Sequence, residues 1–175
     1  MIDNYFKSCK NSNENIEIVY QDQYLMTHIG IITTIQFIDY FIKMSGHKSF
    51  SLTFQTEQFS NNSYMRGISS PYPDYSSRDR ALKEMCNKWK DNNEYDVELK
   101  LETKMPKALP HWRELSFKCG DKILSLYPNG GIINEWFFDL DKAKELHKFY
   151  LLDTTPDIPI PIKKDQDVMY DVEIK

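Results

Sequence analysis

Residues 95–102 carry the clearest β-strand pattern in the chain, and this pattern constrains the fold more than any other feature. Four apolar residues alternate there with four charged ones, namely Tyr95, Val97, Leu99 and Leu101 with Asp96, Glu98, Lys100 and Glu102. Successive side chains on a strand point to opposite faces, so this alternation indicates one buried face and one polar face. The segment therefore predicts a strand of a sheet whose other face meets solvent.

Three more strand patterns follow this segment with short turns between them. One lies near 111–119, a second at 122–127 follows a Gly-Asp turn, and a third at 132–138 follows the turn 128–131. That last turn contains Asn-Gly between apolar runs, which is a strong hairpin signal. We therefore expect these four strands to form an antiparallel meander.

The remaining chain predicts further strands and a small number of helices. Strand patterns occur at 16–20, 50–57 and 168–174, and helical patterns at 32–44, 77–91 and about 140–152, with a short helix over 2–10. Gly46 is placed to end the helix at 32–44. Strands in runs with separate helices predict an α+β fold, in which a mainly antiparallel sheet carries about three packed helices. A length of 175 residues predicts a single globular domain spanning 1–175.

The charge of the chain argues against direct nucleic-acid binding. It has 22 Lys and Arg against 26 Asp and Glu, a formal net charge of −4, with only four arginines. Binding by phosphate neutralisation calls for a basic footprint, often a domain pI above about 9. An acidic protein more readily meets a basic protein, because complementary fields speed their encounter.

No residue pattern predicts catalysis, a metal or a cofactor. The four histidines are scattered, no C-x-x-C or H-E-x-x-H occurs, and Ser45-Gly46-His47-Lys48 lacks the companion motifs of the S-x-x-K enzymes. We therefore expect a protein that is not an enzyme, with no catalytic residue. The alternative is a small hydrolase or transferase whose cleft is assembled only in three dimensions.

The cysteines and the N-terminus predict a cytoplasmic protein. Cys9, Cys86 and Cys119 are odd in number and far apart, which favours reduced thiols over a disulfide framework. The N-terminus lacks the apolar core of a signal peptide, and no apolar run approaches the roughly 18 residues of a membrane span.

Two surfaces are candidates for binding a partner. The first is the charged face of residues 95–102, where Asp96, Glu98 and Glu102 lie; its alternative is a solvated sheet face. The second is the turn-rich segment 58–76, whose aromatic and charged residues have the composition of binding hot spots: Tyr64, Arg66, Tyr72, Asp74 and Tyr75. The alternative for this segment is that the rings cover the core beneath.

The whole profile resembles the immunity proteins of bacterial toxin–immunity pairs, in particular those of contact-dependent growth inhibition systems. The segment 126–152, LYPNGGIINEWFFDLDKAKELHKFYLL, is similar to parts of such proteins. The resemblance implies an antitoxin that covers the active site of a cognate toxin domain, a basic protein and often a nuclease, with an acidic, aromatic-rich surface. The implied partner is thus a protein, with no membrane contact. A regulatory protein that binds a host factor is the remaining alternative.

Overall fold

A computed structural model describes residues 2–12, 14–59, 72–128 and 170–175 of the chain. The elements run in the order α1 (Ile2–Ser12), β1 (Ile16–Gln21), α2 (His28–Ser45), β2 (Ser49–Glu57), α3 (Tyr75–Asn92), β3 (Asp96–Lys104), β4 (Glu114–Cys119), β5 (Lys122–Pro128) and β6 (Tyr170–Ile174). Among these residues, no helix is long and apolar enough to cross a membrane.

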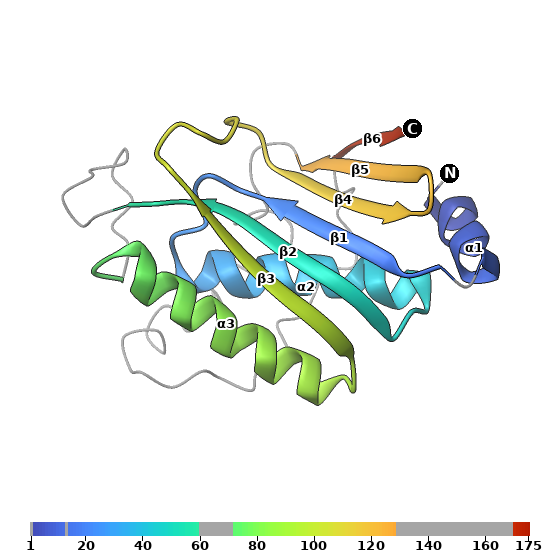
Figure 1. The fold of residues 1–175 in the computed structure, drawn as a ribbon, viewed down its shortest axis with the longest axis horizontal. Helices are drawn as coiled ribbons and strands as arrows, with labels where there is room; N and C mark the ends of the chain where they lie inside the picture. The colour runs from blue at the N-terminus through green and yellow to red at the C-terminus, as the bar shows by residue number, and fades with distance from the viewer. Residues whose placement is uncertain (1, 13, 60–71, 129–169) are drawn as a thin grey trace, which may run out of the picture.

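The described strands form one mixed sheet in the order β3-β2-β1-β4-β5-β6 (Figure 1). Strands β1, β2 and β3 are parallel, with Ile18 opposite Leu52 and Leu52 opposite Leu99. Strands β4, β5 and β6 extend the sheet from β1 in antiparallel fashion. Helices α2 and α3 are the crossovers that connect the three parallel strands.

The predicted α+β fold with a mainly antiparallel four-strand meander is therefore wrong. Strand β3 is not next to β4. It pairs with β2 at one edge of the sheet, and both β2 and β1 lie between it and β4. The alternation at 95–102 reports which face of a strand is buried, and it carries no information about the neighbouring strand or its direction. The predicted strand at 132–138 lies outside the described residues.

The three described helices all pack on one face of the sheet. Phe6 of α1 and Phe41 of α2 both contact Phe117 of β4, and Trp89 of α3 contacts Phe50 of β2. This face is the hydrophobic core, so the opposite face remains polar, which explains the alternation along β3.

The local signals for the helices are confirmed where the structure describes them. Helices α1, α2 and α3 cover the predicted ranges, and the helix predicted at about 140–152 lies outside the described residues. Gly46 ends α2 with a left-handed φ of 70°. The Thr27 side chain begins α2 by accepting a hydrogen bond from the Gly30 amide.

The connection between β3 and β4, residues 105–113, is called here the β3–β4 loop. Because β3 lies at the edge of the sheet and β4 lies beyond β1, the loop must cross the carboxyl ends of β2 and β1 (Figure 1). In open α/β sheets, ligands commonly bind outside the carboxyl ends of the strands, where the chain order changes direction. The carboxyl ends of β1 and β2, with the loop that crosses them, are therefore the first place to look for a functional site.

Candidate functional site

The β3–β4 loop presents two large apolar side chains to solvent. Trp112 is 59% exposed and Met105 is 66% exposed, the highest values among the described large hydrophobic residues. Side chains of this size are normally buried, so their joint exposure on one loop is typical of a contact surface.

A buried carboxylate fixes the backbone of this loop. Glu57, at the end of β2, is 2% exposed and accepts hydrogen bonds from the Lys107 amide at 2.9 Å and the Leu109 amide at 3.1 Å. Gln23 Nε2 donates a third at 3.0 Å. A buried carboxylate is tolerated because these donors replace its water shell. Lys107 adopts a left-handed φ of 66°, which turns the loop at this point.

A buried guanidinium ties the end of β2 to the segment before α2. Arg78 Nη1 donates to the Leu25 carbonyl at 2.9 Å and Nη2 to the Glu57 carbonyl at 3.1 Å. Its Nε pairs with the Asp79 carboxylate at 2.6 Å. Burial lowers the pKa of Arg78, and Asp79 opposes that shift. These bonds join α3, the end of β2 and the segment between β1 and α2, and so hold the backbone of Glu57 in place.

The far end of the loop is anchored to β1. Arg113 Nε donates to Asp22 Oδ2 at 2.9 Å, and Asp22, which is 1% exposed, also accepts from the Tyr24 amide at 2.8 Å. The Tyr24 hydroxyl lies 2.7 Å from His111 Nδ1, and the two rings stack with centroids 6.1 Å apart and an interplanar angle of 21°. The exposed ring of His111, the residue before Trp112 in the chain, is therefore held in place by Tyr24.

The loop and its flanks are locally basic although the chain is acidic. Residues 103–113 contain Lys104, Lys107 and Arg113 and no Asp or Glu. Lys104 pairs with Glu102 at 2.8 Å and Arg113 with Asp22, while the exposed Lys107 forms no ion pair with any described residue. The sequence prediction assigns residues 105–110 to a turn and 111–113 to the start of a strand, and it does not single out this stretch for binding, because the net charge of the chain hides a basic run of 11 residues. A basic run containing Trp and His was the available signal.

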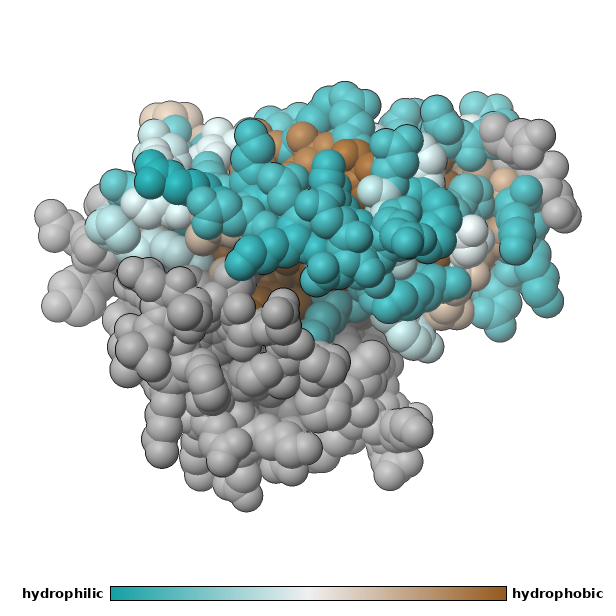
Figure 2. Space-filling model, turned by 90° about the horizontal axis from the view of Figure 1, so that it is seen from below, coloured by the Kyte–Doolittle hydropathy of each residue, from teal (hydrophilic) through white to brown (hydrophobic). Residues whose placement is uncertain are grey.

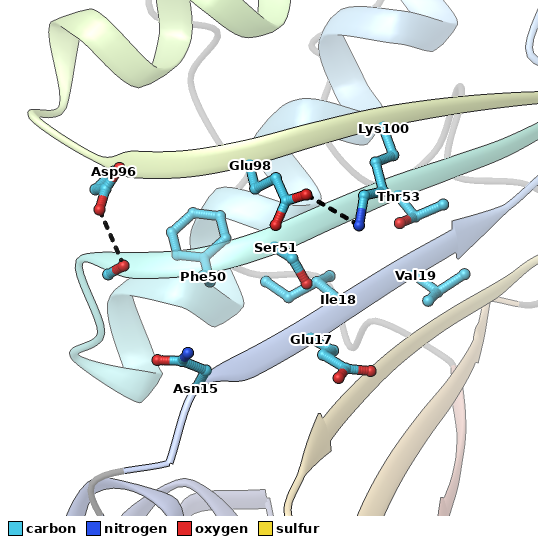
Figure 3. Close-up of a pocket in the computed structure, with 11 residues that line it drawn as sticks. Asn15, Glu17, Ile18, Val19, Phe50, Ser51, Thr53, Asp96, Glu98 and Lys100 are labelled. Atoms are coloured by element: carbon cyan, nitrogen blue, oxygen red, sulfur yellow. Dashed lines mark hydrogen bonds and ion pairs between the residues drawn. The ribbon is translucent and has the colours of Figure 1, made fainter.

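The open face of the sheet contains a shallow cavity of about 500 Å³ near the amino ends of β1, β2 and β3. Figure 3 shows Ser51 and Thr53 of β2 between Glu17 of β1 and the Glu98 and Lys100 side chains of β3. Hydroxyls therefore form its floor and longer charged side chains its walls. In the view of Figure 2, the described surface is predominantly hydrophilic.

The predicted carboxylates lie together on this open face and are already engaged. Asp96 accepts from the Ser49 hydroxyl at 3.2 Å, and Glu98 pairs with Lys100 at 3.0 Å. Glu102 binds Lys104, which lowers the pKa of its carboxyl. Exposed pairs of this kind are worth roughly 0–1 kcal/mol each. The structure thus groups the three carboxylates on the solvated face.

The predicted tyrosine surface is placed differently. Tyr72 is 6% exposed and belongs to the core, and Tyr75 is half-buried against it. Asp74 begins α3 by accepting the Ser77 amide at 2.8 Å, and this hydrogen bond lowers its pKa. Tyr64 and Arg66 lie outside the described residues. The described members of this group therefore have structural roles.

The thiols lie in the interior. Cys9, Cys86 and Cys119 are buried and form no disulfide with one another, and burial raises the pKa of Cys9 to about 11 and that of Cys86 to about 12. Within the described part of the chain, no three His, Cys, Asp or Glu residues are grouped to hold a metal ion.

One family model matches the chain. It is described as the C-terminal domain of the DEAD/DEAH box helicase YjiV, and it matches residues 2–124. This stretch is more than half of the chain and includes the elements from α1 to β4 and the whole β3–β4 loop. No curated protein matches the chain significantly.

This match corrects the expected identity, function and partners. The chain is not an immunity protein or antitoxin of a contact-dependent growth inhibition system, because the matching family is a helicase domain. The same finding shows that the partner prediction, a basic toxin domain without direct contact to nucleic acid, is wrong. The match does not favour the hydrolase, transferase or host-factor alternatives either. The chain belongs to the family of the C-terminal domain of the DEAD/DEAH box helicase YjiV.

Proposed function

We propose that this chain is an accessory domain of a helicase-type protein and that it contacts nucleic acid through the β3–β4 loop. The family match is the observation that carries the first part, because helicases work on nucleic acid. The β3–β4 loop supports the second part, contact with nucleic acid. It is locally basic, it lies at the carboxyl ends of the parallel strands, and its Trp112 is exposed.

The role that we propose is binding, without catalysis by this domain. The buried carboxylates near the loop are occupied, since Glu57 accepts two backbone amides and Asp22 pairs with Arg113. The raised pKa of the Cys9 and Cys86 thiols keeps them protonated near neutral pH. A cytoplasmic location is part of the proposal, and the absence of a disulfide among the three described cysteines supports it.

The expected affinity is modest. With a net charge of −4 and one loop cation, Lys107, that forms no ion pair with any described residue, the domain neutralises few phosphates. Binding without sequence preference then falls in the range of about 10⁻⁴ to 10⁻⁶ M. Such affinity suits a domain that assists a motor by holding strands nearby, because tethering raises the effective concentration.

The test is fluorescence anisotropy of labelled oligonucleotides of about 12 nucleotides, single-stranded and duplex, in about 50 mM salt. We compare the unchanged protein with Lys107→Glu and with Lys83→Glu, a control with the same charge change on the exposed surface of α3. The proposal predicts binding that Lys107→Glu weakens about tenfold and Lys83→Glu leaves within twofold. The proposal would be overturned if neither the single-stranded nor the duplex oligonucleotide bound.

A further inference from the structure

We infer, resting on the proposed function, that the β3–β4 loop selects single-stranded nucleic acid by stacking unpaired bases on Trp112 and the neighbouring His111 ring. The helicase name leaves this choice open, since a helicase meets both duplex and single strands. The choice follows from the charges, the exposed rings and the rigidity of the loop.

Charge alone cannot give the loop useful affinity for a duplex. Of the three Lys and Arg side chains in residues 103–113, Lys104 at the end of β3 is neutralised by Glu102, and Arg113 is neutralised by Asp22. Of these three, only Lys107 is exposed and forms no ion pair with a described residue. The open sheet face beside the loop adds carboxylates such as Glu98, which repel a phosphate backbone. A duplex, which offers mainly its backbone here, is therefore a poor ligand.

Exposed aromatic rings supply the binding affinity that the few charges of the loop do not. Stacking of one base on an aromatic side chain contributes roughly five- to 150-fold in affinity, whatever the base. Trp112 is 59% exposed, so its large ring is open to an incoming base. A second platform follows directly in the chain, because the exposed His111 ring is stacked on Tyr24 and bonded to its hydroxyl. Bases in a duplex already stack on each other, so only unpaired bases can use these rings.

The loop is ordered before any ligand arrives. Glu57 holds the Lys107 and Leu109 amides, and Leu109 is 9% exposed. Arg113 holds the other end through Asp22. A ligand therefore does not have to order the loop backbone, and most of the stacking gain appears as affinity.

The experiment compares single-stranded and duplex oligonucleotides of the same sequence with the unchanged protein, Trp112→Ala and Trp112→Phe. We expect the single strand to bind at least tenfold more tightly than the duplex. Trp112→Ala should weaken single-strand binding at least fivefold, while Trp112→Phe, which keeps a ring, retains most of it. Binding should also quench tryptophan fluorescence more strongly in the unchanged protein than in Trp112→Phe, because Trp112 is exposed to an incoming base whereas Trp89 packs on the core.

Two outcomes separate the inference from the proposed function, and a melting temperature serves as the folding control. If neither nucleic acid binds the unchanged protein, both fail. If duplex and single strand bind equally and Trp112→Ala changes nothing, the stacking inference is overturned while the proposed function stands. A melting temperature of Trp112→Ala within a degree or two of the unchanged protein shows that lost binding is not lost folding, as expected for an exposed side chain.

Discussion

At the scale of single residues, Glu57 shows how a loop that crosses the end of a strand changes the burial expected from the strand's alternating pattern. The alternation along β2 places Glu57 on the same polar face as Gln55, yet Glu57 is 2% exposed because the β3–β4 loop covers it. No sequence pattern identifies such a residue, since its burial depends on a connection that begins 48 residues later. Its carboxylate is the clearest structural reason for the loop's fixed shape.

Glu57→Gln tests this role. The amide group keeps the shape but presents an N–H₂ to one of the backbone donors, so a buried donor loses its acceptor. We expect the free energy of unfolding in urea to fall by about 1–3 kcal/mol. Amide hydrogen exchange at Lys107 and Leu109 should also quicken.

Glu98→Gln is the matched control. Glu98 is 69% exposed and its ion pair among the described residues is with Lys100, so its substitution should change stability by less than about 0.5 kcal/mol. Equal effects of the two substitutions would show that Glu57 does not hold the loop.

At the scale of helices and strands, the sequence located most elements and missed their arrangement. The helical patterns at 32–44 and 77–91 and the strand at 95–102 are present because periodicity reflects local burial. The parallel pairing of β3 with β2 depends on the crossover through α3, which brings together residues distant in the chain. The polar face carrying Asp96, Glu98 and Glu102 was predictable for the same local reason, whereas the exposure of Trp112 was not.

The start of α3 gives a pH prediction. The Ser77 amide lowers the folded-state pKa of Asp74 below its unfolded value, which is near 3.9. Its contribution to stability is therefore full above about pH 4 and is lost as the pH falls through the lowered folded-state pKa.

Asp74→Asn should remove this part of the acid dependence, because asparagine caps a helix without titrating. Melting temperatures measured between about pH 2 and 6 should therefore converge for the two proteins at the acid end. A constant difference between them over this range would contradict the assignment of Asp74 as a titrating cap.

At the scale of the whole molecule, net charge and local charge lead to different conclusions. A net charge of −4 argued against nucleic acid, while the basic run 103–113 lies at the edge of the sheet and the carboxylates of β3 lie on its face. The carboxylates on the open sheet face repel a phosphate backbone, so a nucleic acid is expected to approach the β3–β4 loop rather than this face. An average over the sequence cannot separate these regions, because it has no spatial information.

The salt dependence of binding follows from this arrangement. With one or two phosphates neutralised, the slope of log K against log salt for a single strand should be about −0.7 to −1.4. Anisotropy titrations at several salt concentrations measure it. A slope near −4 or steeper would mean that a larger basic surface than the loop binds the ligand.

The most direct test of the central claim is to locate bound nucleic acid on the protein by NMR. We would record amide and indole spectra of the full chain while adding a single-stranded oligonucleotide. The account predicts that the largest shifts arise at Lys107, His111 and the indole of Trp112. Shifts confined to residues of the open sheet face, such as Ser51 and Glu98, or no shifts at saturating oligonucleotide, would contradict it.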